Sequence, residues 1–350
     1  MWKTFGNDTN LSENQIALVH ATYTQVKDLP VHRLLVERAI VAVEKQDNRA
    51  LYLVFDQGFK EMGPVYPLAL IYCLYPHLET LYSRLGISNQ VMAATLSDIS
   101  IWVKTYERQH AGSTGLDRYW WICRHLCAKV LRLGRLQFEQ GPFTFPFAIY
   151  YDSLLQRYRS FALGAIHCTF DGYIAQEEDA DWLTTFSVKN GLLLGHEVDQ
   201  SLGSISRNLV EVPSDRLLLV CAQTDPVTFV HIPEGEPLTP SLVDASLSEA
   251  LEMFSPSLFV CDSWLLDPEL GKALPPEGNI CHFMNRFQKF PVAFFVPQIF
   301  DRVFGYGAGK EDVLAWKCTT SLQREVQAHL RNGGIFRTMG GFIPNRARLR

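Results

Sequence analysis

Hydrophobic side chains recur every three to four residues through the first part of the chain, and this period predicts a series of amphipathic helices. Residues 11–23, "LSENQIALVHATY", begin with a capping-box spacing, because Ser12 is followed three positions later by Gln15. Residues 116–134, "LDRYWWICRHLCAKVLRLG", keep the helical period up to a closing glycine. The pattern predicts an all-α domain of about five helices over residues 1–130.

The pattern changes after residue 134. "RLQFEQ" alternates apolar and polar positions, as a half-buried strand does, and "FDGY" and "VKNGLL" carry the Asp-Gly and Asn-Gly signals of hairpin turns. Residues 135–232 are therefore expected to form mostly antiparallel sheet. From residue 229 onwards strands alternate with helices, with "SLFVCDSWLL" and "VAFFVPQIF" (292–300) as two of the strands. The predicted fold class is α+β: a helical domain followed, over residues 131–350, by a mixed, mostly antiparallel sheet with packed helices.

Composition narrows the possible functions. A net charge of −5 and a pI near 6.1 argue against a nucleic-acid binder, which carries a concentrated basic excess. Eight cysteines stand mostly alone inside apolar runs, as reduced, buried thiols do, and "CRHLC" lacks the further ligands that a zinc site needs. The N-terminal residues have no apolar signal-peptide core, and no run of about 18 apolar residues occurs. We expect a cytoplasmic protein with no metal, no membrane partner and no nucleic-acid partner.

One segment, "FVHIPEGEPLTPSLVDASLSEAL" (229–251), has the pattern of a strand, a glycine-containing loop and a helix. The free amides and positive dipole end at a helix N-terminus suit an anion such as a pyrophosphate. Gly235 lets a ligand approach the backbone, and Leu238 is suited to line a pantetheine-like arm. An ordinary turn from strand to helix is the alternative interpretation.

Five segments together resemble a bacterial family of acyltransferases: "VLRLGRLQFE", "HIPEGEPLTPSLVDAS", "FVCDSWLLDPEL", "LPPEGNICHFMNRF" and "TTSLQREVQAHLRNGG". Members of this family join an N-terminal helical domain to a C-terminal domain similar to the GNAT fold of acyl-CoA-dependent N-acyltransferases. The resemblance implies an enzyme that moves an acyl group from acetyl-CoA, a longer acyl-CoA or another acyl thioester to an amine of a small molecule or peptide. The alternative is a non-catalytic ligand-binding or regulatory protein on the same fold.

The resemblance also implies where the donor binds. The strand Val227 to Ile232 would lead into a loop, Pro233 to Thr239, and a helix from Pro240 that together grip the pyrophosphate. The predicted donor-binding residues are Pro233, Gly235, Leu238, Thr239 and Asn279, the last as a contact of the pantetheine amide. For Asn279 the alternative is a helix N-cap.

Three residues are candidates for catalysis. His231 and Glu234 lie at the end of the strand and are suited to act as a base, directly or through water. Ser263, in "DSWLLD", is suited to donate a hydrogen bond to the leaving sulfur or to line the acceptor pocket. The alternatives are a structural histidine, an acid in the first turn that favours the helix dipole, and a serine that belongs to the core or caps a turn.

The charges around the loop are unusual for this family. The usual loop of GNAT proteins is Arg/Gln-x-x-Gly-x-Gly/Ala, whereas "IPEGEP" has one glycine, no such Arg or Gln, and two glutamates, which repel a pyrophosphate unless they point away. Residues 118–137 contain five basic residues and no acid: Arg118, Arg124, Lys129, Arg132 and Arg135. These residues either form a solvated helix face or supply the positive charge that the loop lacks.

Overall fold

The computed structural model describes residues 1–293 and 298–345. The chain divides into two compact units. The first contains residues 1–139, 231–236 and 245–250, and the second contains residues 140–230, 237–244 and 251–350. None of the helices in the described ranges is both long and apolar enough to cross a lipid bilayer.

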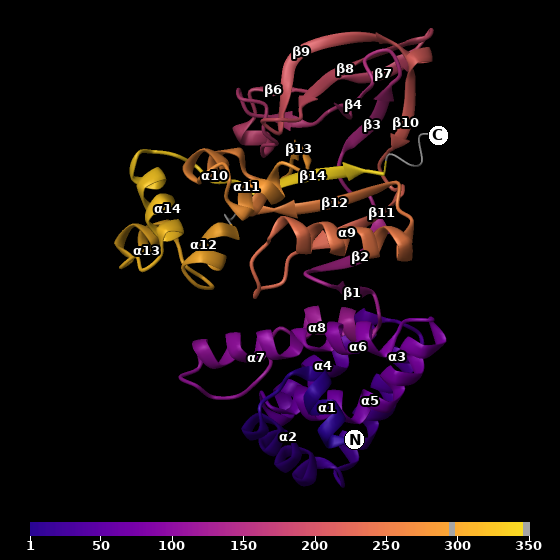
Figure 1. Cartoon of the computed structure of the whole chain (residues 1–350), viewed down its shortest axis with the longest axis vertical. Helices are drawn as coiled ribbons and strands as arrows, with labels where there is room; N and C mark the ends of the chain where they lie inside the picture. The colour runs from indigo at the N-terminus through magenta and orange to yellow at the C-terminus, as the bar shows by residue number, and fades with distance from the viewer. Residues whose placement is uncertain (294–297, 346–350) are drawn as a thin grey trace. The chain divides into compact units, whose positions relative to one another are not determined.

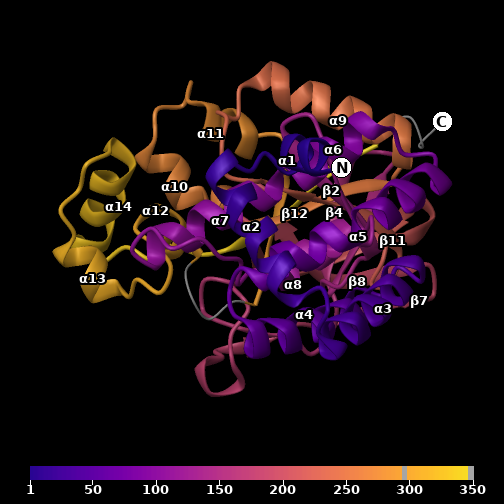
Figure 2. The same cartoon turned by 90° about the horizontal axis from the view of Figure 1, so that it is seen from below.

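The first unit is built from helices, coloured indigo to magenta in Figures 1 and 2. They are α1 (Trp2–Thr9), α2 (Glu13–Val26), α3 (Pro30–Glu44), α4 (Asn48–Met62), α5 (Tyr66–Arg84), α6 (Asn89–Leu96), α7 (Asp98–Gln109) and α8 (Tyr119–Leu126). The capping box at the start of α2 is confirmed, because the Ser12 hydroxyl accepts from the Gln15 amide and the Gln15 side chain accepts from the Ser12 amide. The helical prediction is confirmed, but about five helices was too few. Residues 89–109, for example, form two helices, α6 and α7, which meet at Ser97.

The helix expected over residues 116–134 is shorter than predicted. Helix α8 ends at Leu126, Ala128 takes a left-handed backbone conformation (φ 51°), and residues 130–133 form strand β1 (Val130–Leu133). This strand pairs antiparallel with β2 (Leu136–Pro142) through a two-residue turn in which Gly134 has φ 60°. The apolar residues of "VLRL" are compatible with a helix or a strand. The hydrogen-bonded pairing with β2 stabilises the strand.

The first of two six-stranded sheets has the order β1-β2-β11-β12-β14-β13. Its remaining strands are β11 (Pro226–His231), β12 (Leu258–Ser263), β13 (Gln288–Pro291) and β14 (Met339–Pro344). Strands β11 and β12 are parallel, whereas β12 with β14 and β13 with β14 are antiparallel. The parallel register joins Thr228 to Phe259 and Phe229 to Val260, and both strands continue beyond those pairs.

The second sheet has the order β10-β3-β4-β8-β7, and β9 also pairs with β8. Its strands are β3 (Phe147–Asp152), β4 (Arg157–Ala162), β7 (Phe186–Lys189), β8 (Leu192–Asp199), β9 (Ser204–Pro213) and β10 (Leu217–Cys221), and β5 (His167–Cys168) and β6 (Trp182–Leu183) form a small separate pair. The hairpin predicted at Asn190 and Gly191 joins β7 to β8, with both residues at positive φ. The predicted α+β fold with a mixed, mostly antiparallel sheet is confirmed.

The described residues of the C-terminal part form the helices α9 (Pro240–Phe254), α10 (Pro268–Ala273), α11 (Asn279–Met284), α12 (Gln298–Val303), α13 (Lys310–Ala315) and α14 (Ser321–Arg331). The strand predicted over residues 292–300 is not found as such. Residues 294–297 lie outside the described residues, and helix α12 begins at Gln298.

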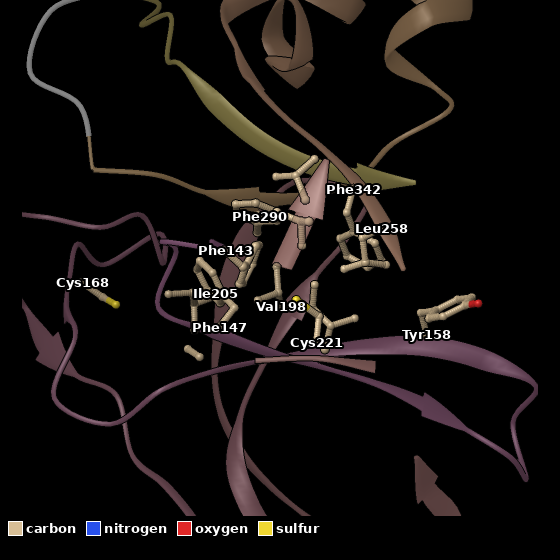
Figure 3. Close-up of a cluster of buried hydrophobic side chains, with 14 residues drawn as sticks. Phe143, Phe147, Tyr158, Cys168, Val198, Ile205, Cys221, Leu258, Phe290 and Phe342 are labelled. Carbon is tan, nitrogen blue, oxygen red and sulfur yellow. The ribbon is translucent and has the colours of Figure 1, made fainter. Parts of the chain in front are cut away.

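Both sheets contribute to the core of the second unit (Figure 3). Phe147 of β3 and Val198 of β8 share one buried cluster with Leu258, Phe290 and Phe342 of the first sheet. All of these side chains are at most 3% exposed. Burial of this aromatic and aliphatic surface is the main force that holds the two sheets face to face.

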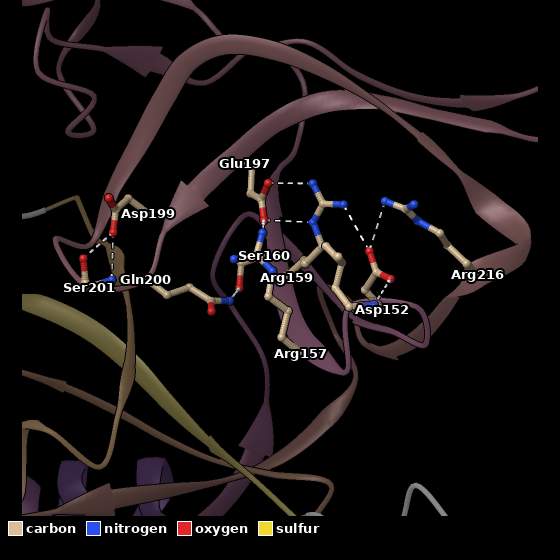
Figure 4. A network of polar contacts seen from close by, with 10 residues as sticks. Asp152, Arg157, Arg159, Ser160, Glu197, Asp199, Gln200, Ser201 and Arg216 are labelled. Carbon is tan, nitrogen blue, oxygen red and sulfur yellow. Dashed lines mark hydrogen bonds and ion pairs between the residues drawn. The ribbon is translucent and has the colours of Figure 1, made fainter.

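A buried ion network ties strands of the second sheet together (Figure 4). Arg159 donates to Asp152 at 3.2 Å and to both carboxylate oxygens of Glu197, and Arg216 lies 3.3 Å from Asp152. Burial by itself raises the pKa of the Asp152 carboxyl, but the backbone amide of Leu155 and the guanidinium of Arg159 outweigh it and hold the pKa below 3.8. Arg159, Asp152 and Glu197 satisfy one another within the fold, which indicates a structural role, whereas Nε of Arg216 is buried without a hydrogen-bond partner among the described residues.

Candidate active site at the end of strand β11

His231 is the last residue of β11, and its imidazole is paired with a carboxylate. Its Nε2 atom lies 3.3 Å from Oε2 of Glu139, a residue of the neighbouring strand β2. The His231 and Glu139 side chains are 24% and 14% exposed. An ionised carboxylate only accepts hydrogen bonds, so Nε2 carries the proton and, in the neutral ring, Nδ1 carries the lone pair. Nδ1 has no hydrogen-bond partner among the residues that the structure describes.

Glu139 is kept ionised by a second partner. Arg124 of α8 donates from Nε to Oε1 at 3.1 Å and from Nη2 to Oε2. Burial by itself raises the pKa of the Glu139 carboxyl, but the hydrogen bonds from His231 and Arg124 outweigh it, and the pKa lies below its ordinary value of 4.5. The carboxylate is therefore charged at neutral pH and holds the imidazole in one orientation.

An indole packs against the same imidazole. The Trp121 ring meets the His231 ring edge-on, with centroids 5.0 Å apart, and the Arg124 guanidinium lies 4.8 Å from the Trp121 ring centroid. Trp121 is fixed in turn, because its Nε1 donates to Oδ2 of Asp98 at 3.2 Å. Asp98 is 2% exposed. These contacts restrict rotation of the His231 ring.

A second histidine lies behind Trp121 and is fully buried. His125 Nδ1 donates to the carbonyl of Trp121 at 3.1 Å, so Nε2, 3.2 Å from the amide of Gln137, is the accepting nitrogen. Burial holds the pKa of His125 below 6.5, although the nearby Asp98 carboxylate acts in the opposite direction. His125 is therefore a neutral, structural residue of the site.

Two arginines hold the loop that follows His231. Arg135, 5% exposed, donates to the carbonyls of Pro233 at 3.0 Å and Glu236 at 2.6 Å. Arg108 of α7 makes a two-bond pair with Glu234, at 3.0 and 3.1 Å. Within the basic stretch 118–137, Arg135 is therefore not part of a solvated helix face, and the two donors described for it bind loop carbonyls. A supply of positive charge from this stretch to a ligand stays a prediction.

Each predicted loop residue has a clear local structure. Gly235 has φ 135°, a conformation that disfavours side chains, and no atom lies within 4 Å of where its Cβ would stand. Pro233 and Leu238 are buried, and Thr239 is the N-cap residue of α9, although its side chain makes no capping hydrogen bond. Glu234 makes no hydrogen bond with His231 in the described part of the chain. It also stands six positions before α9 and so is not in the first turn of that helix.

Ser263 and Asn279 belong to the second unit. The Ser263 hydroxyl accepts from the Leu265 amide at 3.2 Å and so caps the short 3₁₀ turn Trp264–Leu266, which agrees with the capping interpretation. Its own proton stays available to donate. Asn279 is the first residue of α11, and the N-cap position belongs to Gly278.

Sequence reasoning missed the carboxylate and the indole beside His231. Glu139 and Gln137 are two positions apart in strand β2, so their side chains lie on the same face of the strand. Two polar residues on one face of a half-buried strand are the feature of the sequence that points to a polar site there. Arg108 and Trp121 carried no signal, because their partners lie more than a hundred residues away in the chain. In the described part of the chain, no three His, Cys, Asp or Glu side chains are grouped closely enough to hold a metal ion.

The helical unit followed by a mixed sheet is the architecture expected of the N-acyltransferase class. Residues 130–343 match the family described as the GNAT-like C-terminal domain, and residues 3–128 match the N-acyltransferase N-terminal domain. The chain belongs to this two-domain acyltransferase family. The resemblance inferred from the sequence motifs is confirmed.

Solved structures show the same fold. A mutant acyltransferase in complex with octanoyl-CoA is 19% identical, with a TM-score of 0.61, over 98% of this chain and 87% of that one. An acyltransferase in complex with decanoyl-CoA and teicoplanin is 19% identical, with a TM-score of 0.60, over 97% of this chain and 86% of that one. No curated protein matches the chain in sequence.

Proposed function

We propose that the protein transfers an acyl group from an acyl-CoA, or another acyl thioester, to an amine of a small molecule or peptide. Membership of the N-acyltransferase family supports the reaction class. The acyltransferases of the same fold that were solved with octanoyl-CoA and decanoyl-CoA support a CoA thioester as donor. The complex with teicoplanin supports an acceptor of peptide type. The cytoplasmic location predicted from the sequence suits an enzyme that uses a CoA thioester.

His231 is the general base of this proposal, and its bond with Glu139 is the observation that carries it. The amine nitrogen attacks the thioester carbonyl carbon, and its proton passes to Nδ1 of His231. The C–S bond then breaks, the amide forms, and the imidazolium gives its proton to the leaving thiolate, which regenerates the neutral base. Glu139 stabilises the imidazolium that forms in between.

Glu234 was the other candidate base. Its carboxylate is 59% exposed and, among the described residues, is bonded to Arg108 and not to His231, so no buried partner orients it toward acting as a base. We therefore assign proton transfer to His231 alone.

The donor's phosphates are assigned to the loop and to the N-terminus of α9. Gly235 supplies a backbone without a side chain, Thr239 precedes the first free amides of the helix, and Pro233 and Leu238 shape the loop. Asn279 is assigned to the pantetheine amide. None of these residues is charged, so the positive charge that the phosphates require has to come from elsewhere.

Thiol release tests the proposal. Purified protein is mixed with acetyl-, octanoyl- or decanoyl-CoA and a panel of amines, and free CoA is followed with a thiol reagent while thermal unfolding reports donor binding. We expect amine-dependent thiol release and a donor-dependent rise in Tm, with His231→Gln keeping the rise in Tm and losing about 100-fold in kcat. Absence of both signals with every thioester would overturn the proposal and favour the non-catalytic binding protein.

A further inference from the structure

The pair between Arg108 and Glu234 has the geometry with which arginine binds phosphate. Nη1 donates to Oε1 at 3.0 Å and Nη2 to Oε2 at 3.1 Å, so the guanidinium presents two parallel donors to one anionic group. Nη2 also donates to Oγ1 of Thr105 at 2.9 Å, and Thr105 is 3% exposed. The guanidinium is thus held in place from its own helix, independently of Glu234.

This ion pair is exposed to solvent. Both side chains are 59% exposed, and an ion pair this accessible adds little to stability because water solvates the separated charges well. A ligand that offers the guanidinium a more strongly charged pair of oxygens therefore displaces the carboxylate at low cost. A phosphate group is such a ligand.

The loop segment 233–236 contains no lysine or arginine that could bind a phosphate. The segment 233–236 carries Glu234 and Glu236, and Arg135 is buried with its donors directed at backbone carbonyls. Arg108 is the arginine whose exposed guanidinium is bonded to a side chain of this segment. Glu234 is also the residue next to Gly235, the position assigned to the donor's phosphates.

We infer that Arg108 is a phosphate ligand of the acyl-CoA donor, and that Glu234 occupies it when no donor is bound. Donor binding exchanges the Glu234 carboxylate for a phosphate on the same guanidinium, and the displaced carboxylate turns to solvent. The two glutamates of the loop are then compatible with an anionic ligand, because one of them is a competitor that leaves. The inference rests on the donor site of the proposed function.

Two substitutions with opposite expected effects test the exchange. Affinity for CoA is measured by calorimetry at low salt for the wild type, Arg108→Gln, Glu234→Gln and the double variant. Arg108→Gln is expected to weaken CoA binding about tenfold or more, whereas Glu234→Gln is expected to tighten it about threefold or more. The double variant is expected to behave like Arg108→Gln, since the competitor matters only while the guanidinium is present.

Matched controls distinguish this exchange from a pair of Arg108 and Glu234 that only stabilises the loop. Pantetheine, which lacks the phosphates of CoA, is expected to bind all four proteins equally, and Arg108→Lys, which keeps the charge but not the two-bond geometry, is expected to fall between wild type and Arg108→Gln. Arg33→Gln, which breaks the exposed pair of Arg33 with Asp28, is expected to leave CoA affinity unchanged.

Two outcomes overturn the inference while the proposed function stands. One is wild-type protein that binds CoA while Glu234→Gln binds it equally or more weakly. The other is Arg108→Gln protein that loses affinity for pantetheine as much as for CoA. Wild-type protein that binds neither CoA nor any acyl-CoA overturns the donor site itself, and the exchange with it.

Discussion

Oε2 of Glu139 lies 3.3 Å from Nε2 of His231, a residue 92 positions later in the chain. The contact fixes which imidazole nitrogen is protonated, and in the proposed mechanism the other nitrogen, Nδ1, takes the proton of the amine. Histidine bases of other enzymes are oriented in the same way by a buried carboxylate, which also stabilises the charged ring after proton transfer. Here the carboxylate shares its charge with Arg124, so the dyad is part of a three-residue network.

Replacement of Glu139 tests whether this orientation matters for catalysis. Glu139→Gln removes the charge that favours the imidazolium. The new amide can also donate to Nε2, which would place the proton of the neutral ring on Nδ1. We expect kcat to fall by about 10- to 100-fold while donor affinity stays within about twofold. Steady-state kinetics with saturating donor and a separate binding isotherm give the two quantities.

Arg124→Gln is the control for Glu139→Gln. It removes the other partner of the carboxylate and leaves the bond between Glu139 and His231 in place, so we expect a smaller loss of kcat. If both variants lose the same activity and both lose several degrees of Tm, Glu139 acts through packing and not through the imidazole.

Much of the fold follows from local patterns in the sequence. The capping box of Ser12 and Gln15 and the Asn190–Gly191 turn depend on residues a few positions apart, and the structure has both. Residues 130–133 were misassigned because their partner strand decides between helix and strand. The site was harder still, since Glu139 and His231 meet only when β2 and β11 pair, and no local pattern encodes that pairing.

Gly235 offers a test of the donor loop with a matched control in the same chain. Gly235 and Gly305 have nearly the same φ, 135° and 132°, and at both a Cβ would meet no atom within 4 Å. Valine at either position should therefore destabilise the fold by the same backbone strain, about 1–3 kcal/mol. Only Gly235→Val is expected to weaken acyl-CoA binding, by more than about tenfold, or about 1.4 kcal/mol.

Calorimetry of donor binding and urea unfolding of the two valine variants separate these effects. Equal donor affinity in both variants would show that Gly235 serves the turn and that the donor's phosphates lie elsewhere. Loss of folding in Gly235→Val alone would lead to the same conclusion.

The buried His125 predicts that the protein loses stability in mild acid. Its folded-state pKa lies below the ordinary 6.5 because burial disfavours the charged ring. Between these two values the unfolded chain binds a proton that the folded chain does not, so the free energy of unfolding falls as pH drops below about 6.5 and levels off beneath the folded pKa. His32, whose pKa burial also lowers, adds to the same slope.

Urea unfolding at pH 5, 6, 7 and 8 measures this slope. His125→Gln loses hydrogen bonds and should be less stable at every pH, but its stability should depend less on pH than that of the wild type. An unchanged slope would show that His125 is not the group that takes up the proton.

Lys289 of β13 should make the folded protein less stable than a methionine would at the same position. It is 6% exposed, its ammonium group has no hydrogen bond or ion pair among the described residues, and it stands opposite Gly341 of β14. Burial lowers the pKa of Lys289 from its ordinary 10.5. We expect Lys289→Met, which keeps the aliphatic length, to raise the free energy of unfolding at pH 7 by about 1–2 kcal/mol.

The pH dependence gives the same prediction a second readout. Between the lowered folded pKa and 10.5 the unfolded state binds the proton and the folded state does not, so the wild type gains stability as pH rises through that interval. The Met variant lacks this gain, and the two stability curves converge at high pH. Lys60→Met, at a lysine that is 70% exposed, is the control and should change stability by less than about 0.5 kcal/mol. If Lys289→Met destabilises the protein at pH 7, the ammonium group has a stabilising partner and is not an unpaired buried charge.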